Sequence, residues 1–377
     1  MIYFDNAATG GFKASAVLDA AVTTLKYLNA NPGRSGHRLA LAGAKTVIGA
    51  RMAVQELFNA EDADRVIFTK NTTEALNLAL IGTAEEDGHI VTTVYEHNSV
   101  LRTLTHLKER FRIGYTVADG TPEAIAAAMK KNTYLVAVNH VSNVTGREAD
   151  AAAIGKIARE KGALFLLDAA QSAGVLPVDM EADHIDYLCV PGHKGLYGPM
   201  GTGMLLCGPD TPLPTLMEGG TGSQSLLLDQ PEELPDRLES GTVNTPGICG
   251  LRAGMEWVMK MGVDRIGRHE IRLMAMLYDR IGSIPGLRLY TPRPRLEAAA
   301  PVLSLNIDGL SSEETGARLD RMGIAVRPGL HCAPSAHRQW GTVPDGTVRL
   351  APSAFTTEAQ IEKTAYHLWE IARKPLQ

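Results

Sequence analysis

Short runs of β-branched and other apolar residues alternate with amphipathic stretches through the first half of the chain. Six of these runs predict strands, at residues 65–69, 89–94, 134–138, 163–167, 187–190 and 203–207. Two of the intervening helices have clear ends, because Thr121-Pro122 supplies an N-cap and a first-turn proline, and Gly162 is placed as a left-handed stop after residues 150–161. This alternation predicts an α/β fold with a mostly parallel sheet covered by helices and with ligands at the carboxyl ends of its strands.

The pattern changes after residue 207. Residues 208–246 are rich in Gly, Pro, Ser and Thr and predict a long irregular segment of a functional or interfacial kind. Apolar residues at 273, 277, 281 and 284 share one face of a long predicted helix that Pro285-Gly286 ends. The remaining elements predict a smaller α+β domain, with strands at 302–307 and 347–351 and helices at 311–322 and 357–373.

The length and composition favour a soluble enzyme of two domains. A chain of 377 residues exceeds what one hydrophobic core usually supports, and 45% hydrophobic and 21% charged residues are typical of a globular protein. We expect a large domain at residues 11–260 and a small domain made of residues 1–10 and 261–377.

Charge and cysteine usage exclude several classes of partner. The formal net charge is −5 and there is no long basic run, so we expect neither nucleic-acid nor membrane binding. Charged, Gly or Pro residues interrupt each apolar stretch before it could cross a bilayer. Four cysteines without CxxC pairing and an N-terminus without a basic, then apolar, leader predict a location in the reducing cytoplasm.

Two residues at predicted strand ends suggest cofactor chemistry. Lys194 follows the strand at 187–190 in a glycine-rich turn, where desolvation lowers the pKa of an amine and favours a Schiff base; its alternative is an ordinary surface lysine. Asp168 ends the strand at 163–167, and a buried carboxylate there can keep a pyridine nitrogen protonated. The alternative for Asp168 is the N-cap of a following helix.

The sequence around these residues resembles the class V aminotransferase branch of the fold-type I pyridoxal-phosphate (PLP) enzymes, and within it the cysteine desulfurases most of all. The segments that carry the resemblance are Asp168-Ala-Ala-Gln171 and Gly192-His-Lys-Gly-Leu-Tyr-Gly-Pro-Met-Gly-Thr-Gly203. It extends from Tyr3-Phe-Asp-Asn-Ala-Ala-Thr9 to Val348-Arg-Leu-Ala-Pro-Ser-Ala-Phe355, nearly the whole chain. It implies pyridoxal 5'-phosphate as the cofactor and the fold of a fold-type I PLP transferase.

The resemblance also implies roles for the residues at the strand ends. Lys194 would form the Schiff base with the cofactor, Asp168 would pair with the pyridinium nitrogen, and Gln171 would hydrogen-bond the ring hydroxyl. Asn143 would lie beside the ring on the substrate's flank, and His97 would stack on the ring and shuttle protons. A histidine after a strand more often has a structural role, which is the alternative for His97.

The phosphate group of the cofactor needs hydroxyl and N–H donors at a helix start. Thr72 and Thr73, in Thr69-Lys-Asn-Thr-Thr-Glu74, supply hydroxyls where a strand passes into a helix, although the segment also resembles a Thr-x-x-Glu capping box. The resemblance makes these threonines the phosphate site and adds His193 as a donor.

One position departs from the family pattern. Many relatives carry a serine or threonine shortly before the lysine, whereas this chain has Pro191, which offers neither a hydroxyl nor an N–H. Residues 239–246 resemble the family segment that reaches the neighbouring subunit's site, which makes Thr242 a further phosphate ligand. We therefore expect a homodimer with shared active sites.

Cys332 is the candidate nucleophile. It lies in Arg327-Pro-Gly-Leu-His-Cys-Ala-Pro334, where Arg327 and His331 would favour the thiolate. The alternative, a buried inert thiol, better suits the cysteines in apolar runs, which are Cys189, Cys207 and Cys249. The segment is similar to the short-loop branch of desulfurases, which implies a dedicated sulfur-acceptor protein.

Arg349, on the strand at 347–351, matches the family arginine that grips the substrate α-carboxylate, a task that suits a planar fork; its alternative is a solvated edge residue. Asn6 and Ala7 would line the same pocket, and whether Arg327 contacts substrate stays open. We expect no metal ion in this site.

These inferences predict a PLP-dependent cysteine desulfurase that converts L-cysteine to L-alanine and leaves a persulfide on Cys332 for an acceptor, in sulfur metabolism and iron–sulfur cluster assembly. A selenocysteine lyase acting on L-selenocysteine is the first alternative. An aminotransferase without a sulfur role is the second, and a non-catalytic partner protein on the same fold is the third.

Overall fold

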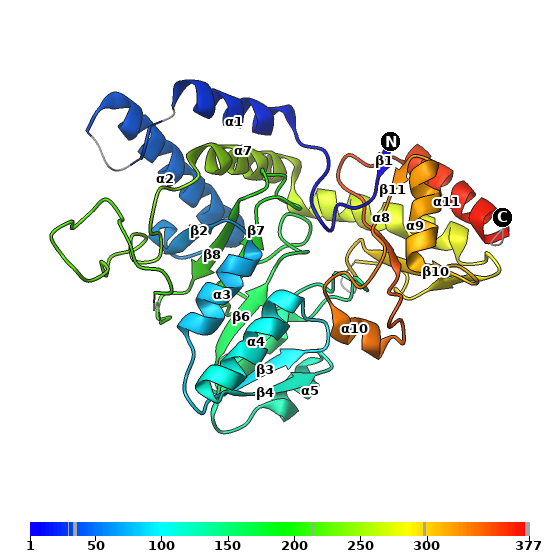
Figure 1. Ribbon diagram of the computed structural model, residues 1–377, viewed down its shortest axis with the longest axis horizontal. Helices are drawn as coiled ribbons and strands as arrows, with labels where there is room; N and C mark the ends of the chain where they lie inside the picture. Colours follow the sequence, from blue (N-terminus) through cyan, green and yellow to red (C-terminus); the bar gives the residue numbers. More distant parts are fainter. Residues whose placement is uncertain (29, 33–35, 213–214, 297–298, 374–377) are drawn as a thin grey trace.

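The central feature of the computed structural model is a seven-stranded sheet with helices on both faces (Figure 1). The structure describes residues 1–28, 30–32, 36–212, 215–296 and 299–373. In spatial order the strands are β2 (Val66–Thr69), β8 (Gly203–Cys207), β7 (Tyr187–Pro191), β6 (Leu164–Asp168), β5 (Thr133–Asn139), β3 (His89–Thr93) and β4 (Gly114–Ala118).

Most neighbouring strands of this sheet are parallel, as the alternating pattern predicts. The exception is β8, which runs antiparallel to both β2 and β7. The six predicted strands and the mostly parallel sheet are confirmed, and the edge strand β4 has no counterpart among the predictions. The sequence did not predict β4, because this strand is only partly buried and therefore lacks a continuous apolar run.

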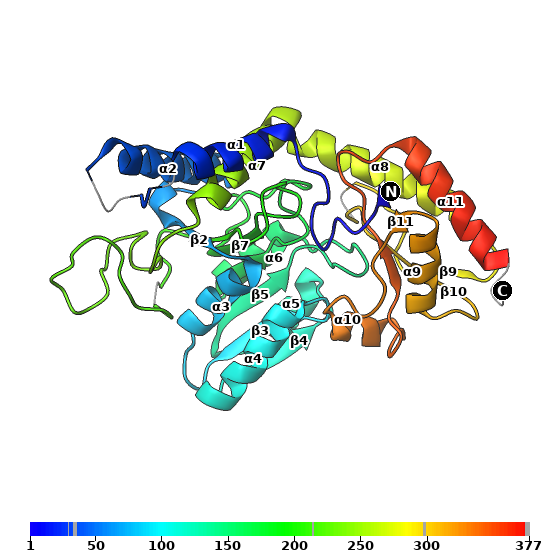
Figure 2. The same ribbon diagram turned by 45° about the horizontal axis from the view of Figure 1, so that its top comes forward.

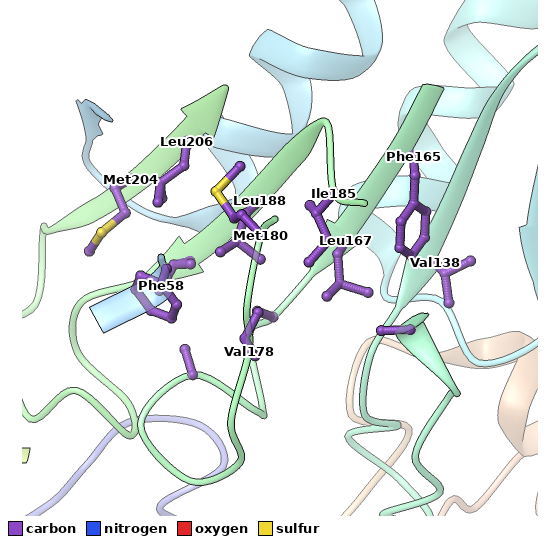
Figure 3. Close-up of a cluster of buried hydrophobic side chains, with 14 of the residues drawn as sticks. Phe58, Val138, Phe165, Leu167, Val178, Met180, Ile185, Leu188, Met204 and Leu206 are labelled. Carbon is purple, nitrogen blue, oxygen red and sulfur yellow. The ribbon is translucent and has the colours of Figure 1, made fainter. Parts of the chain in front are cut away.

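Successive residues of each central strand pack into different cores. On β5, Val136 and Val138 belong to one buried cluster, and Leu135 and Ala137 belong to the cluster on the opposite face. Figure 3 shows part of the first cluster, in which Phe165 and neighbouring apolar side chains of adjacent strands meet. A strand that is buried on both faces reads as a continuous apolar run, and this explains why these strands were predictable.

Two sets of helices cover the two faces of the sheet. The first cluster is covered by α2 (Arg38–Phe58), α5 (Pro122–Ala128), α6 (Ala151–Glu160) and α7 (Thr245–Met261). The other face is covered by α3 (Thr72–Gly82) and α4 (Asn98–Phe111). Figures 1 and 2 show α1 (Ser15–Tyr27) beside α2 and α7 at the outer edge of this layer.

The helix ends confirm the local chemistry read from the sequence. The Thr121 side chain accepts the N–H of Ala124 at the start of α5, and Pro122 takes the first helical position. Asp150 caps α6 in the same way, and Gly162 follows this helix with a φ of +71°.

A second, smaller sheet lies at the other end of the long helix α8 (Val263–Ile281) (Figure 1). Its three antiparallel strands have the order β12 (Val348–Leu350), β10 (Leu303–Ile307) and β9 (Leu287–Leu289). The helices α9 (Ser312–Arg321) and α11 (Glu358–Arg373) complete this region. Ile284 lies beyond the end of α8, so the prediction of that helix was about one turn too long.

The N-terminal segment belongs to the smaller region. The strand β1 (Ile2–Tyr3) pairs in parallel with β11 (Ile324–Ala325), and Phe4 joins the buried cluster built around α8, α9 and α11. The division at residues 10 and 260 stays a prediction. Positions 29, 33–35, 213–214, 297–298 and 374–377 of the predicted ranges lie outside the described residues. Among the described helices, none is both long and apolar enough to span a membrane.

Candidate active site

The ends of four neighbouring strands place the predicted site residues around one pocket. His97 follows β3, Asn143 follows β5, Asp168 ends β6, and Lys194 follows β7. The carboxyl ends of parallel strands share one edge of a sheet, so residues far apart in sequence meet there. Eight predicted residues line this pocket, namely Thr72, Thr73, His97, Asn143, Asp168, Gln171, His193 and Lys194.

Asp168 and Lys194 are buried groups of opposite charge, and each affects the pKa of the other. Asp168 is 2% exposed, and burial raises its pKa to about 6, although the N–H of Ala170 (2.9 Å to Oδ1) and the charge of Lys194 oppose that rise. Burial lowers the pKa of Lys194 to about 8 against the attraction of Asp168. Turn residues and no helix directly follow Asp168, so its carboxylate does not serve as a helix cap.

His97 has the structural role that the sequence left open, and it also lies at the pocket. It caps α4, because the backbone N–H of Ser99 donates to Nδ1 at 3.1 Å, and it also lines the pocket. Burial, and then the charges of Lys194 and nearby arginines, lower the pKa of His97 to about 4, so the ring is neutral. Because Nδ1 accepts a hydrogen bond, the proton lies on Nε2, and the ring enters the pocket as a donor.

The start of α3 contributes a second wall of the pocket. Its N-cap is Asn71, whose side chain accepts the N–H of Glu74, so the Thr-x-x-Glu reading of this cap is wrong. Thr72 and Thr73 are thereby left to face the pocket at the helix N-terminus, where N–H groups point outward. Ser99, which the sequence did not single out, bonds Thr73 Oγ1 at 2.8 Å and also lies 2.8 Å from Nδ1 of His97.

His193 and Gln171 attach the pocket to the N-terminal segment. Nδ1 of His193 lies 3.1 Å from Oγ1 of Thr9, and burial, reinforced by the charge of Lys194, lowers the pKa of this histidine to about 4. Nε2 of Gln171 donates to the carbonyl of Ala7 at 3.0 Å. Gln171 therefore keeps its Oε1 and one N–H for a ligand.

Asn6 and Ala7 lie beside Lys194 in an adjoining pocket, and their role as substrate-binding residues stays a prediction. The Asn6 amide is already used, since Nδ2 donates to the carbonyl of Ala351 (3.0 Å) and Oδ1 accepts the N–H of Gly11 (3.1 Å). Its role is to shape the pocket wall and to hold the N-terminal segment to the end of β12.

Thr242 does not reach the Lys194 pocket of its own chain. It lines a separate cavity with Lys70, Glu74 and Asn244, near the start of α7. The contribution of Thr242 to a second subunit's site stays a prediction.

Arg349 is buried, which contradicts the alternative of a solvated edge arginine. It is 2% exposed, and it donates from Nη1 to the carbonyl of Asn143 (3.0 Å) and from Nη2 to Oδ1 of Asp5 (3.2 Å). The backbone of Arg327 pairs with that of Arg349 through two hydrogen bonds of 2.8 and 3.2 Å. Burial lowers the pKa of Arg349 to about 10.

Cys332 lies exposed on a loop that is held against the pocket wall. Its carbonyl accepts the N–H of Asn98 at 2.7 Å, and the carbonyl of His331 accepts Nδ2 of Asn143 at 2.7 Å.

The other cysteines differ from Cys332 in exposure. Cys189 and Cys207 are buried, and burial raises the pKa of both, that of Cys207 to about 12, while Cys249 is half-buried. The expectation that His331 favours a thiolate is wrong, because burial lowers its pKa to about 2 and leaves the ring neutral.

The comparisons with known proteins agree with this geometry. The sequence model of the class-V aminotransferases matches residues 2–364. The chain belongs to this family.

Relatives within the family carry a common description. The chain is 34% identical to a probable cysteine desulfurase of Methanothermobacter thermautotrophicus, over 98% of this chain and 94% of the relative. It is also 34% identical to a probable cysteine desulfurase of Pyrococcus abyssi, over 96% and 92% of the two chains. The apo structure of cysteine desulfurase from Thermococcus onnurineus NA1 superimposes with a TM-score of 0.90 at 34% identity, over 99% of this chain and 94% of that one. The resemblance read from the sequence and its fold are therefore confirmed.

Class-V aminotransferases are PLP enzymes, and the pocket of this member fits that cofactor. Asn143 Oδ1 is buried without a hydrogen-bond partner among the described residues, and Oδ1 of Asn139, which lines the same pocket, likewise has none. Unpaired buried polar atoms are costly, so their presence at a pocket wall indicates a polar ligand. An amine, a carboxylate and a helix N-terminus in one pocket match an aldehyde, a pyridine nitrogen and a phosphate.

Glu96 is the residue of this class-V aminotransferase that sequence reasoning missed. It is fully buried, and its Oε1 accepts the N–H of Asn139 (2.9 Å) and the hydroxyl of Thr93 (2.6 Å). These bonds tie the end of β3 to the end of β5, and Glu96 directly precedes His97 in the chain. Burial raises the pKa of Glu96 to about 8. The sequence could have indicated Glu96, because its carboxylate lies in the same turn as His97, a candidate catalytic histidine.

Proposed function

We propose that this chain is a PLP-dependent cysteine desulfurase that converts L-cysteine to L-alanine and keeps the sulfur as a persulfide on Cys332. The observation that carries the proposal is the position of Cys332, exposed and hydrogen-bonded through its loop to Asn98 and Asn143 at the wall of the Lys194 pocket. The cysteine desulfurases among the relatives support the same activity.

The cofactor would be held by groups on three sides of the pocket. Lys194 would bond its aldehyde carbon, Asp168 its ring nitrogen, and Gln171 its ring hydroxyl. Thr72, Thr73 and His193 would bind its phosphate, as helix N-termini do. When bound, PLP supplies an electron sink that weakens the bonds at the substrate's α- and β-carbons.

Arg349 would orient the substrate through its α-carboxylate. Its fork already contacts the carbonyl of Asn143 and the carboxylate of Asp5, so its direction is fixed before substrate arrives. Lys194, with a pKa of about 8, is suited to take the Cα proton near neutral pH. His97, fixed as an Nε2–H donor, would hydrogen-bond the same reacting region.

Cys332 completes the reaction. Its thiolate attacks the sulfur of the substrate, so an S–S bond forms as the C–S bond breaks. The electron pair of the C–S bond stays with the substrate carbon, which takes up a proton and leaves as alanine. One cysteine and one thiol thus become one alanine and one persulfide.

The test compares Cys332→Ala with a matched control, Cys249→Ala, which removes a half-buried thiol outside the pocket. We expect Cys332→Ala to abolish alanine and sulfide production from L-cysteine, with the PLP absorbance intact, and Cys249→Ala to retain both products. Undiminished turnover in Cys332→Ala would disprove the assignment.

The same two variants separate the alternatives. A selenocysteine lyase would still release selenide from L-selenocysteine without Cys332, and an aminotransferase would consume a keto acid. Neither alternative requires a thiol at the pocket wall.

A homodimer with shared sites forms part of this proposal. Apolar side chains that are about half exposed cover α1 and α2, namely Leu18, Val22 and Leu25 on α1 and Leu39, Leu41, Ile48 and Met52 on α2. Exposed apolar side chains of this kind on neighbouring helices are typical of a surface that another chain covers. Oγ1 of Thr242 lies 3.5 Å from Nδ2 of Asn31, in the segment between α1 and α2. A second copy of the chain that covers this surface would therefore bring Thr242 of one copy to the phosphate site of the other. A monomer with full PLP occupancy in light scattering would contradict this arrangement.

We further propose a sulfur-acceptor protein as the partner that takes the sulfur from Cys332. We propose the cytoplasm as the location, because an exposed thiol nucleophile must stay reduced between turnovers.

A further inference from the structure

The loop that carries Cys332 has an unusual backbone. His331 has a φ of 49° and Cys332 a φ of 58°, so two consecutive non-glycine residues occupy the left-handed region. Residues other than glycine rarely adopt this conformation, and it persists only where the surroundings enforce it. The contacts of the two residues are therefore expected to be specific.

Both strained residues are held by hydrogen bonds from the edge of the large sheet. The N–H of Asn98, the first residue of α4, donates to the carbonyl of Cys332 at 2.7 Å. Nδ2 of Asn143, which follows β5, donates to the carbonyl of His331 at 2.7 Å. We call these two bonds the cysteine-loop anchor.

Apolar packing continues the anchor on the far side of Cys332. Ala333 is completely buried, and with Ala336 of the short helix α10 (Pro334–Gln339) it forms a cluster with Tyr95 and Val144. Tyr95 belongs to the turn before His97, and Val144 follows Asn143. The loop is thus fixed to the same two turns that carry two walls of the cofactor pocket.

We infer that the backbone N–H of Asn98 is a positioning group for the nucleophile, since it holds Cys332 where its sulfur can attack a substrate in the Lys194 pocket. This inference rests on the proposed function.

Asn98→Pro removes this donor with little cost to the helix. Proline is favoured at the first position of a helix, and His97 (φ −72°, ψ 156°) already has the extended conformation that the residue before a proline requires. The proline ring also places a carbon against the carbonyl of Cys332. Asn98→Ala is the matched control, because it keeps the N–H and removes only a side chain without a hydrogen bond among the described residues.

The readout separates positioning of the thiol from the rest of the chemistry. Misplacing a reacting group by about 1 Å costs about 100-fold in rate, so we expect single-turnover persulfide formation to fall about 10- to 100-fold in Asn98→Pro. In Asn98→Ala it should change less than about twofold, since the positioning N–H remains. Exchange of the alanine Cα proton with D2O uses Lys194 and not Cys332, so it should be unchanged in both variants.

Equal rates of persulfide formation in Asn98→Pro and Asn98→Ala would overturn the inference. Failure of the proposed function would look different, because the wild-type enzyme itself would then exchange the alanine proton without producing alanine from cysteine.

A second measurement needs no variant. The first N–H of a helix has no partner within the helix, so hydrogen-exchange protection of the Asn98 amide would report its bond to Cys332. We expect protection in the wild-type holoenzyme. An Asn98 amide that exchanges as fast as an unprotected one would also overturn the inference.

Discussion

Arg349 allows the substrate clamp to be tested independently of the sulfur chemistry. A guanidinium has five N–H donors. Two of those on Arg349 bond the carbonyl of Asn143 and the carboxylate of Asp5, and its buried Nε has no partner among the described residues. The remaining N–H groups are available to a substrate carboxylate. Replacement by lysine keeps the charge and removes the fork.

The size of the effect follows from the number of donors. A lysine ammonium has three donors on one atom, so it cannot keep both protein contacts and also form two parallel bonds to a carboxylate. A hydrogen bond between charged groups contributes about 1.5–3 kcal/mol. Losing one such bond corresponds to a loss of about 10- to 150-fold in binding of the substrate carboxylate.

The assay compares two amines that differ only in the carboxylate and that carry no sulfur. Dissociation constants for L-alanine and ethylamine are measured from the change in PLP absorbance, for the wild type and for Arg349→Lys. We expect the constant for L-alanine to rise about 10- to 150-fold and that for ethylamine to stay within about twofold. An equal loss for both amines would refute the clamp and leave Arg349 a structural role through Asp5.

Two further predictions concern cofactor loading and stability. Burial lowers the pKa of Lys194 to about 8, and only a neutral amine attacks an aldehyde. The rate of PLP uptake by the apo chain, measured by stopped-flow absorbance, should therefore increase with pH up to about 8 and then level off. A rate that still increases near pH 10 would contradict this. Glu239→Ala breaks a buried ion pair with Arg51 (2.6 Å) and should lower the free energy of unfolding by about 3–5 kcal/mol in urea titrations. Glu256→Ala breaks a more exposed pair with Arg252 and should cost no more than about 1 kcal/mol, so equal costs would contradict the argument from burial.

The sequence was most informative where burial imposes a pattern. The central strands are buried on both faces, so their apolar runs stand out, and the polar residues at their ends necessarily meet at one edge of the sheet. The helices α1, α2 and α7 were not predicted, because part of their apolar surface stays exposed or faces one another rather than the sheet. The reversed direction of β8 has no local signal, since an apolar run is the same read in either direction.

Within the site, the residue types were predictable and their contacts were not. Asp168, Lys194 and Arg349 could be assigned from strand ends and from the family resemblance. The hydrogen bond between Asn98 and Cys332 joins two segments that are far apart in sequence and uses only backbone atoms. The residue types at these positions therefore could not predict it. The error over His331 has a similar origin, because its burial, and hence its neutral ring, depends on the packing of the whole loop.

His97 shows that a structural and a chemical role need not be alternatives. From the sequence, helix capping competes with catalysis as an explanation of this histidine. In the structure the cap determines the chemistry, because the N–H of Ser99 donates to Nδ1 and only Nε2 can then carry the proton of the neutral ring. Without the cap, both tautomers would be available and the ring would present either an acceptor or a donor to the pocket. The helix start therefore decides that His97 presents a hydrogen-bond donor at Nε2, and not an acceptor.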